Sequence, residues 1–382
     1  MIRKICVVTG SRADYDHLYW LLKLLKKNKK FDLSIIVTGS HLEKKYGASI
    51  KNITKDGFKK LHKIKLFLSK DKVENITRST ALGILSFSKK LKQIKPDIVL
   101  MLGDRYEIFS CAISASFLKI PIAHFNGGEV TSGAFDEWIR HSITKMSTIH
   151  FVANKKYQNR VIQLGENKRN VFNVGGLSSD NVRKTKTLKK KEIEKICNFK
   201  FYSKNILVTF HPVTLGEKNS KKYFKEIILA LEKLEETLII FTFPNADNDN
   251  VSIISMIKKF VKKNKNAICF ISLGRKKYLS IMKYCDAVVG NSSSGLLEAP
   301  YYNIPTINIG NRQEGREKAN TVIDCSTNRI EILKSIKSMN KKKLKLNNIK
   351  NLYGLGNTAE NVIKILSNKN LNLNIKKKFV DA

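Results

Sequence analysis

Residues 4–25 have the sequence KICVVTGSRADYDHLYWLLKLL, and this stretch decides the fold. Its first six residues form a short apolar run with β-branched side chains, which is typical of a buried strand. Gly10 follows the run, and apolar residues at helical spacing occupy 15–25. A strand that turns through a glycine into an amphipathic helix is the first part of a β-α-β unit. The pattern predicts an α/β fold with a parallel sheet.

The same alternation continues along the N-terminal half of the chain. Further strands are expected at 33–38, 97–102, 120–125 and 148–153, and further helices at 80–92, 106–118 and 136–146. Strands that alternate with helices form a parallel sheet with helices on both faces, joined by right-handed crossovers. We therefore predict a doubly wound, Rossmann-like domain for this half.

A polar stretch with two glycines, VGGLSSD at 174–180, interrupts the alternation. Beyond it the pattern restarts, with strands expected at 205–210, 238–242, 267–271, 287–290 and 306–309, and helices at 221–234, 252–263, 276–284 and 294–300. We predict a second Rossmann-like domain, so that the two domains are 1–176 and 177–355. Residues 356–382 are expected to form a final helix at 358–366 and a mobile Lys-rich tail from Asn368.

The composition is that of a globular protein. Of the 382 residues, 42% are hydrophobic, and no apolar run approaches the roughly 20 residues that a membrane-spanning helix needs. The N-terminal apolar run is too short for a signal peptide, so we expect a cytoplasmic protein with no membrane partner. The six cysteines are scattered without metal-ligand spacing, and we expect them to be reduced, small apolar residues.

The formal net charge is +39, a value typical of nucleic-acid-binding proteins. Its distribution argues against that function. Only 12 of the 71 basic residues are Arg, and the Lys residues are spread along nearly every segment expected to be helical. Nucleic-acid sites use Arg for bidentate contacts and place aromatic residues between the basic ones. We therefore expect no nucleic-acid partner.

The positions of the few arginines are informative. Half of them lie in glycine-containing or acidic segments expected to be loops or helix starts: Arg12, Arg105, Arg140, Arg275, Arg312 and Arg316. A chain that uses Lys wherever any cation suffices retains Arg where the planar, forked guanidinium matters, as in phosphate recognition.

Open parallel sheets bind ligands at the carboxyl ends of their strands. After the first strand, the glycine turn and Arg12 suit an anionic ligand at a helix start, and an ordinary turn with a surface arginine is the alternative. This segment is not a Gly-x-Gly-x-x-Gly fingerprint, so a nicotinamide cofactor is not indicated. GDR at 103–105 places Asp104 and Arg105 together at another strand end, where a helix cap with a solvated arginine is the alternative.

The next strand end adds further carboxylates. Asn126 precedes two glycines and Glu129, and the following helix begins with Asp136 and contains His141. Adjacent strand ends therefore bring Asp104, Glu129 and Asp136 toward one site, where mutually repelling carboxylates favour proton transfer near neutral pH. A set of helix caps and salt bridges is the alternative.

The C-terminal half has a second group of candidates. His211 lies at a strand end, where a functional role competes with a packed, structural one. GNSSSG at 290–295 is a strand-to-helix loop that can offer amides and hydroxyls to a diphosphate, or can simply cap its helix. Glu298 in that helix can accept hydrogen bonds from a ribose, and Arg312 in the next loop adds a candidate phosphate contact.

Together these motifs resemble the UDP-N-acetylglucosamine 2-epimerase family, particularly its hydrolysing branch in bacterial sialic-acid-type sugar synthesis. The matching segments keep their order over most of the chain: TGSRADY at 9–15, TGSHL at 38–42, GDR at 103–105, GGE at 127–129, RHSITK at 140–145, GNSSSG at 290–295 and GNRQxGR at 310–316. The combination is highly specific, although no single motif is.

The resemblance implies a glycosyltransferase-B-like pair of Rossmann-type domains that bind a sugar nucleotide in the cleft between them, without a metal or redox cofactor. Similar enzymes eliminate UDP across C1 and C2 to give a 2-acetamidoglycal and then add water, so that C2 of the free sugar is inverted. The resemblance makes Asp104, Asp136 and His211 acid and base candidates and implies a homo-oligomer. It implies phosphate and ribose contacts for Arg12, Arg105, Arg140, Arg312, Ser292, Ser293 and Glu298.

Asn126 departs from the family pattern, because many members carry a carboxylate directly before the two glycines. Asparagine cannot accept a proton, so either Glu129 or Asp136 takes that role or Asn126 positions the sugar or the water. The expected substrate is UDP-N-acetylglucosamine, which would give N-acetylmannosamine and UDP. The alternative substrate is a 2,4-diacetamido-2,4,6-trideoxyglucose nucleotide, as in legionaminic-acid pathways. A glycosyltransferase of the same architecture is the alternative from another enzyme class.

Overall fold

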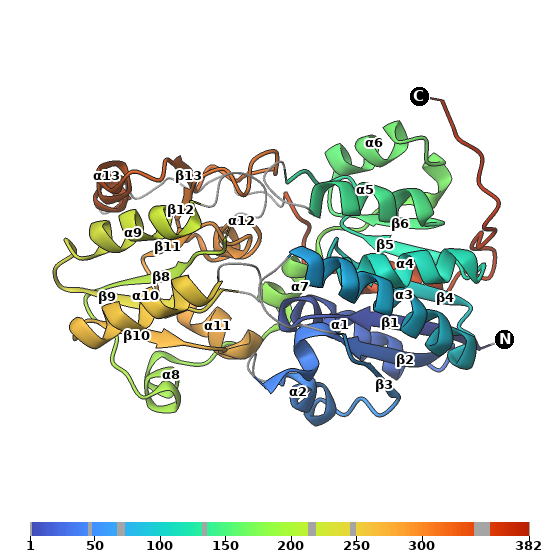
Figure 1. Cartoon of the computed structure of the whole chain (residues 1–382), viewed down its shortest axis with the longest axis horizontal. Helices are drawn as coiled ribbons and strands as arrows, with labels where there is room; N and C mark the ends of the chain where they lie inside the picture. The colour runs from blue at the N-terminus through green and yellow to red at the C-terminus, as the bar shows by residue number, and fades with distance from the viewer. Residues whose placement is uncertain are drawn as a thin grey trace. The chain divides into compact units, whose positions relative to one another are not determined.

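The computed structural model describes residues 2–44, 48–66, 73–131, 136–212, 219–244, 250–339 and 352–381. They form two compact units, each built on its own parallel sheet (Figure 1). Unit 1 contains Met1–Glu129, Asp136–Arg183 and Tyr353–Ala382, and unit 2 contains Val130–Phe135 and Lys184–Leu352. The chain thus passes into unit 2 for a few residues after Glu129 and returns to unit 1 at Asp136. It enters unit 2 again at Lys184 and returns to unit 1 at Tyr353.

The sheet of unit 1 has seven parallel strands in the order β3-β2-β1-β4-β5-β6-β7. They are β1 (Arg3–Thr9), β2 (Phe31–Thr38), β3 (Leu61–Ile64), β4 (Ile98–Leu102), β5 (Ile122–Phe125), β6 (Ile149–Val152) and β7 (Val171–Asn173). The strand order reverses between β1 and β4. In doubly wound sheets this reversal marks where ligands bind, at the carboxyl ends of the strands.

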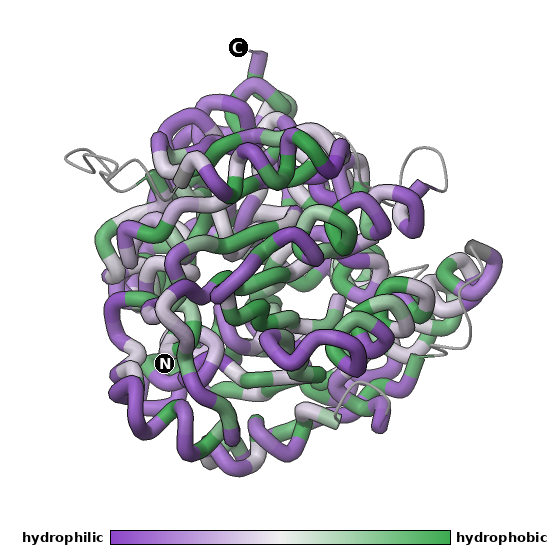
Figure 2. The backbone as a smooth tube through the Cα atoms, turned by 90° about the vertical axis from the view of Figure 1, so that its left-hand side faces the viewer, coloured by the Kyte–Doolittle hydropathy of each residue, from purple (hydrophilic) through white to green (hydrophobic). Residues whose placement is uncertain are grey.

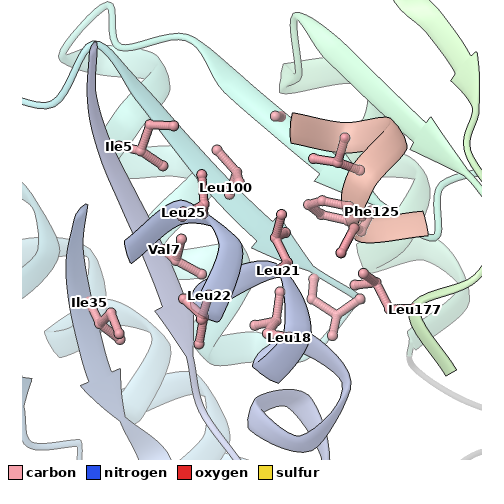
Figure 3. Close-up of a cluster of buried hydrophobic side chains, with 14 of the residues drawn as sticks. Ile5, Val7, Leu18, Leu21, Leu22, Leu25, Ile35, Leu100, Phe125 and Leu177 are labelled. Atoms are coloured by element: carbon pink, nitrogen blue, oxygen red, sulfur yellow. The ribbon is translucent and has the colours of Figure 1, made fainter. Parts of the chain in front are cut away.

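Helices connect these strands. They are α1 (Arg12–Lys27), α2 (Ile50–Lys55), α3 (Val73–Ile94), α4 (Tyr106–Phe117), α5 (Asp136–Met146), α6 (Lys155–Gln163), α7 (Leu177–Lys184) and α14 (Thr358–Leu366), with short 3-10 turns η1 (Gly39–Leu42) and η3 (Lys168–Asn170). Figure 3 shows the leucines of α1 against the sheet: Leu18, Leu21, Leu22 and Leu25 are fully buried in one cluster with Ile5 and Val7. Their spacing places them on one face of the helix, which explains why α1 packs there.

The last helix, α14, belongs to unit 1 although it follows unit 2 in the chain. Ala359, Val362 and Leu366 lie in the same buried cluster as the leucines of α1. Asp180, which is fully buried on α7, accepts hydrogen bonds from the amides of Thr358 at 3.0 Å and Ala359 at 2.7 Å. This carboxylate satisfies amides at the helix start that have no partner within the helix.

The Lys-rich tail was predicted to be mobile, but in the structure it packs on unit 1. Lys377 Nζ donates hydrogen bonds to both carboxylate oxygens of buried Glu166, at 2.8 and 2.7 Å, and to the carbonyl of Ser147 at 2.8 Å. Lys145 Nζ lies 4.9 Å from the ring centroid of Phe379. Composition alone could not reveal these partners, since they come from α5 and from the turn after α6.

The sheet of unit 2 has six parallel strands in the order β10-β9-β8-β11-β12-β13. They are β8 (Lys204–Thr209), β9 (Thr237–Thr242), β10 (Ala267–Phe270), β11 (Ala287–Gly290), β12 (Thr306–Ile309) and β13 (Val322–Cys325). The helices are α8 (Lys190–Cys197), α9 (Ser220–Leu231), α10 (Asn250–Lys263), α11 (Gly274–Lys283), α12 (Ser294–Leu297) and α13 (Arg329–Met339), with the 3-10 turn η4 (Ala299–Tyr302). The order reverses between β8 and β11, as it does between β1 and β4 in unit 1.

Both faces of these sheets are covered. Along β8, Ile206 and Val208 lie in one buried cluster and Leu207 in another, as expected when successive side chains point to opposite faces. All residues of β4 and β9 are buried. The helices instead carry hydrophilic and hydrophobic residues along their length (Figure 2). Continuously apolar strands and two-faced helices are the pattern of a doubly wound α/β unit.

The predicted fold class, two Rossmann-like α/β units, is confirmed. The predicted elements differ from the observed ones mainly at their ends, but eight elements of the described residues were not predicted: α2, β3, α6, β7, α7, α8, β13 and α13. The predicted helix at 136–146 and strands at 287–290 and 306–309 coincide with α5, β11 and β12. The helix predicted at 294–300 is shorter, because α12 ends at Leu297 and Pro300 lies in η4. Proline has no amide hydrogen to continue an α-helix. The units divide between Arg183 and Lys184, within the charged segment that follows the glycine stretch.

Gly290, the last residue of β11, offers a sharp test of the unit 2 packing. Its φ is +131°, and a Cβ atom there would lie 2.0 Å from the carbonyl oxygen of Thr209 on the neighbouring strand. Gly290→Ala is therefore expected to cost at least about 3 kcal/mol, because the backbone must shift. Gly274→Ala is the matched control, since Gly274 also has a positive φ but no atom within 4 Å of the added Cβ. Thermal unfolding midpoints should fall much further for Gly290→Ala, and equal shifts would contradict this packing.

Candidate active site

Three loops of unit 1 follow the carboxyl ends of neighbouring strands. β1 ends at Thr9, β4 at Leu102 and β5 at Phe125, and these strands are adjacent in the sheet. Because parallel strands end at the same edge, the loops beginning at residues 10, 103 and 126 start side by side at the point where the strand order reverses. Seven of the candidate residues lie in these loops or in the first turns of the helices beyond them.

The loop after β1 is stabilised by its own carboxylate. Asp14 Oδ2 accepts hydrogen bonds from the amides of Gly10 at 3.2 Å and Ser11 at 2.9 Å, and the Ser11 hydroxyl accepts one from the Asp14 amide at 3.3 Å. Burial raises the pKa of Asp14 to about 6, although the Arg105 charge opposes this. The amides of Gly10 and Ser11 at this helix start thus already serve Asp14. Arg12 remains a candidate contact for such a ligand.

Asp104 lies in the turn after β4 and binds Arg140 from α5. Arg140 Nε donates to Asp104 Oδ2 at 2.8 Å, and Nη2 donates to the same oxygen. The side chain of Arg140 is 1% exposed and that of Asp104 is 19% exposed. A pair so far withdrawn from water is screened little by salt. It therefore joins the turn after β4 to α5 under ordinary ionic conditions.

Arg140 also reaches the loop after β5. Its Nη1 donates to the carbonyl of Glu129 at 2.8 Å and to Glu137 Oε2 at 3.0 Å. Burial lowers the pKa of Arg140, but the charges of Asp104, Glu129 and Glu137 outweigh it and hold the pKa above its ordinary value. Arg140 is thus a permanent cation that ties two loops to one helix. His141 Nε2 contacts the other Glu137 oxygen at 3.0 Å, so this imidazole lies at the border of the same cluster.

Arg105 contacts the carboxylate of Glu107, which was not among the predicted site residues. Arg105 Nε donates to Glu107 Oε2 at 3.3 Å and Nη2 donates to Oε1 at 3.4 Å. The Glu107 side chain is 1% exposed, whereas that of Arg105 is 20% exposed. An acidic residue in the first turn of a helix ordinarily stabilises the helix start, so only the fold reveals that Glu107 is buried among the loops.

Asn126 begins the loop after β5 in the left-handed conformation, with φ of +64°. Asparagine is among the non-glycine residues that tolerate this conformation best. Its amide donates to the carbonyl of Phe151 at 3.2 Å, which fixes the start of the loop against β6. Asp136 is the first residue of α5 and follows residues 132–135, which lie outside the described part of the chain.

In unit 2, Asn291 organises the loops after β8, β11 and β12. Its side chain accepts a hydrogen bond from the His211 amide at 2.7 Å and donates one to the His211 carbonyl at 2.8 Å. The Asn291 carbonyl accepts hydrogen bonds from Arg312 Nη1 at 3.1 Å and Gln313 Nε2 at 2.8 Å. Two predicted site residues, His211 and Arg312, are thus held by one buried asparagine.

The serine loop and Glu298 lie around a buried tyrosine. Tyr278 Oη lies 2.5 Å from the Ser294 hydroxyl, which in turn lies 3.3 Å from the Ser292 hydroxyl. Burial and the nearby charge of Glu298 raise the pKa of Tyr278 above its ordinary value, so the phenol stays neutral. Ser293 precedes α12, and Glu298, which is 7% exposed, follows it. Hydroxyls at the start of α12 and a carboxylate directly after its end suit a ligand with both phosphate and ribose groups.

Within the described residues, no three His, Cys, Asp or Glu side chains are grouped so that they could hold a metal ion. All six cysteines are free, and Cys6, Cys111, Cys285 and Cys325 are buried. Burial raises the pKa of the Cys6 thiol to about 12, which leaves it unreactive. In the part of the chain that the structure describes, no helix combines the length and the apolar character needed to cross a membrane.

A family model decides the identity of the chain. The model described as UDP-N-acetylglucosamine 2-epimerase matches residues 23–367. The chain belongs to the UDP-N-acetylglucosamine 2-epimerase family. Its relatives place it in the hydrolysing branch, and it is therefore a sugar-nucleotide epimerase. Family membership favours this enzyme over the glycosyltransferase and nucleic-acid alternatives.

Several relatives match most of the chain. It is 41% identical to the GDP/UDP-N,N'-diacetylbacillosamine 2-epimerase (hydrolyzing) of Campylobacter jejuni, over 86% of both chains. It is 38% identical to the polysialic acid biosynthesis protein P7 of Escherichia coli, over 88% of this chain and 85% of that one. It is 34% identical to the UDP-N,N'-diacetylbacillosamine 2-epimerase (hydrolyzing) of Legionella pneumophila, over 96% of both chains.

A solved structure of an epimerase supports the fold assignment. The UDP-GlcNAc 2-epimerase of Methanocaldococcus jannaschii, in complex with UDP-GlcNAc and UDP, matches with a TM-score of 0.80. The match covers 95% of this chain and 99% of that one, at 21% identity. At this identity the likeness concerns the fold alone, and it confirms the glycosyltransferase-B-like class.

The epimerase fold divides the predicted site residues between the two units. Unit 1 carries Arg12, Asp104, Arg105, Asn126, Glu129, Asp136 and Arg140, and unit 2 carries His211, Ser292, Ser293, Glu298 and Arg312. Hydrogen bonds join Asp104, Arg140 and the Glu129 carbonyl in unit 1, and they join His211 and Arg312 to Asn291 in unit 2. The predicted site residues did not include Glu107, Glu137, Asn291 or Tyr278. Asn291 lies inside the GNSSSG motif, which was the available signal for it.

Proposed function

We propose that this enzyme hydrolyses a nucleotide-linked 2,4-diacetamido-2,4,6-trideoxyglucose and releases the free sugar with C2 inverted. The observation that carries the proposal is the 41% identity to the Campylobacter enzyme, whose name specifies N,N'-diacetylbacillosamine, the same sugar. The 34% identity to the Legionella enzyme, whose name specifies the same sugar, over 96% of both chains, supports it further. The proposed sugar is the alternative substrate that was considered in the sequence because of Asn126.

The proposed reaction has two steps. A base removes the C2 proton while the C1–O bond to the diphosphate breaks, which releases the nucleotide and leaves a 2-acetamidoglycal. Water then adds its oxygen to C1, and C2 receives a proton on the face opposite to the one that lost its proton. The overall reaction therefore consumes one water molecule. The C2 proton is weakly acidic, and a positioned acid or base is needed at each step. Asp104, Glu129, Asp136 and His211 are the candidates.

The leaving diphosphate needs positive charge that is already in place. Arg12, Arg105 and Arg312 are the proposed contacts, together with the hydroxyls of Ser292 and Ser293. Arg140 is better suited to hold Asp104, because its buried guanidinium already serves Asp104, Glu137 and the Glu129 carbonyl. We therefore revise its proposed role from phosphate contact to positioning of the carboxylate. Glu298 is the proposed ribose contact.

Asn126 fits the proposed sugar. A residue with an amide in place of a carboxylate cannot exchange a proton, but it can both donate to and accept from an acetamido group. Proton transfer then falls to the other candidates, which are Asp104, Glu129, Asp136 and His211. The second candidate substrate is UDP-N-acetylglucosamine, which the matching family model names and which would yield N-acetylmannosamine.

Proton NMR in D2O tests the substrate directly. The purified enzyme is incubated with the UDP- and GDP-linked diacetamido sugars and, separately, with UDP-N-acetylglucosamine. We expect turnover of a diacetamido substrate, giving the free manno sugar with deuterium at C2 and the nucleoside diphosphate. Turnover of UDP-N-acetylglucosamine alone would establish the second candidate. Absence of turnover with all three would contradict the proposal and favour a transferase that requires an acceptor.

A further inference from the structure

His124 is a buried histidine on β5 that lies beneath the proposed carboxylate. Its Nε2 lies 2.8 Å from the carbonyl oxygen of Gly103, and its Nδ1 lies 3.2 Å from the Thr144 hydroxyl. A carbonyl oxygen can only accept, so Nε2 carries the proton, and Nδ1 accepts the hydrogen bond from Thr144. The imidazole thus bridges the turn after β4 to helix α5.

This bridge lies parallel to the ion pair between Asp104 and Arg140. Gly103 and Asp104 are consecutive residues of one turn, and Arg140 and Thr144 are four residues apart on one face of α5. The turn and the helix are therefore held together twice, once through the side chain of Asp104 and once through the carbonyl that precedes it. A turn held at two neighbouring points can move less than a turn held at one, and this restricts the direction of the carboxylate that the turn carries.

His124 is closely packed and buried where it forms this bridge. A Cβ atom at Gly127 would lie 3.0 Å from the Thr144 hydroxyl oxygen and 3.5 Å from His124 Nδ1, so a larger residue there would press on the bridge. Burial lowers the pKa of His124 to about 4. The charges of His150 and Arg140 lower this pKa further, whereas the Gly103 carbonyl and Asp104 raise it. The ring is therefore neutral at neutral pH, which the bond from Thr144 to Nδ1 requires.

We propose that His124 is a positioning residue, which fixes the direction of Asp104 by tying the turn after β4 to α5. The role is distinct from proton transfer, because both ring nitrogens are engaged inside the protein. The inference rests on the proposed function insofar as Asp104 acts on the sugar. A displacement of about 1 Å at such a residue can lower the rate about 10²-fold without weakening substrate binding.

Two variants of His124 separate positioning from simple packing. His124→Gln retains an N–H that can reach the Gly103 carbonyl, whereas His124→Leu retains only apolar volume. We expect His124→Leu to lower kcat by about 10²-fold with KM within about threefold, and His124→Gln to stay within about fivefold of wild type. Ile122→Ala is the matched control, since Ile122 is buried two residues earlier on the same face of β5. It should lower the unfolding midpoint and leave kcat unchanged.

A double-mutant cycle with Asp104→Asn then tests whether His124 acts through Asp104. If it does, His124→Leu lowers kcat less than about twofold further in the Asp104→Asn background, and the shifts in unfolding midpoint are non-additive by more than about 2 °C. The Ile122→Ala and Asp104→Asn shifts should add. Additive effects for His124 and Asp104, or a His124→Leu enzyme with kcat within twofold of wild type, would overturn the proposal. Unfolding midpoints can be measured without turnover. They therefore test the connection between the turn after β4 and α5 even if the enzyme does not turn over the proposed substrates.

Discussion

Replacing Asp104 with asparagine is expected to lower kcat by about 10³-fold while changing the Kd for UDP by less than about fivefold. The two side chains have nearly the same shape, and the amide oxygen can still accept the hydrogen bond from Arg140 Nε. The change removes the negative charge of the carboxylate and, with it, the capacity to exchange a proton. Acid–base catalysis by one side chain contributes about 10²–10⁴-fold, which sets the expected size. Turnover is measured by NMR, and UDP binding by titration calorimetry.

Asp97→Asn is the control for this change, because Asp97 lies at the opposite end of the same strand. Its Oδ2 accepts a hydrogen bond from the Lys4 amide at 2.7 Å, and the residue is exposed. The substitution removes one negative charge beside β4 without touching the proposed site, so kcat should be that of wild type. An Asp104→Asn enzyme that keeps more than a tenth of wild-type kcat would remove Asp104 from the acid and base candidates.

The fold was predictable wherever a strand is apolar along its whole length. β4, β9 and β11 are buried at every residue, and their sequences are continuous runs between polar or glycine-containing turns. Three strands, β3, β7 and β13, were not predicted, because each lies at an edge of its sheet and carries polar residues such as His62, Asn173 and Asp324. An edge strand needs only one paired side, so its sequence carries a weaker pattern.

The candidate site was predictable at the level of loops but not of partners. Strand ends and glycine turns pointed to the segments with Asp104, Glu129 and His211, because a parallel sheet brings such ends to one edge. The sequence could not show that Arg140 would bind Asp104, which lies 36 residues earlier. It also could not show that Asn291 joins His211 to Arg312. Contacts between distant loops depend on the tertiary structure, and local spacing does not encode them.

The scarcity of arginine was an informative signal with a broader meaning than phosphate recognition. Arg105 contacts buried Glu107, and Arg312 contacts the carbonyl of Asn291. Arg105 uses two directed N–H groups of its planar guanidinium for this contact, a geometry that the compact ammonium of lysine cannot reproduce, and Arg312 uses one. Such an arginine can organise its loop and contact a diphosphate, and the phosphate contacts of Arg12, Arg105 and Arg312 remain predictions.

Arg140→Met is expected to lower the free energy of unfolding of unit 1 by about 3 kcal/mol and to abolish measurable turnover. The guanidinium is 1% exposed, and its loss removes the hydrogen bonds that it donates to two carboxylates and to a buried carbonyl. Breaking a buried ion pair costs about 3–5 kcal/mol, and the lower value applies because the Asp104 and Glu137 side chains are 19% and 25% exposed. Calorimetry should show the corresponding unfolding midpoint fall by about 6–12 °C.

Arg140→Lys distinguishes charge from geometry at this position. Lysine keeps the positive charge but has one compact ammonium, which cannot serve Asp104, Glu137 and the Glu129 carbonyl together. Its unfolding midpoint should lie between those of wild type and Arg140→Met, with turnover still reduced because Asp104 loses its two-point contact. Arg169→Met at an exposed arginine is the control and should shift the midpoint little. If Arg140→Lys matched wild type in both measurements, charge alone would suffice, and the forked contact with Asp104 would have no catalytic role.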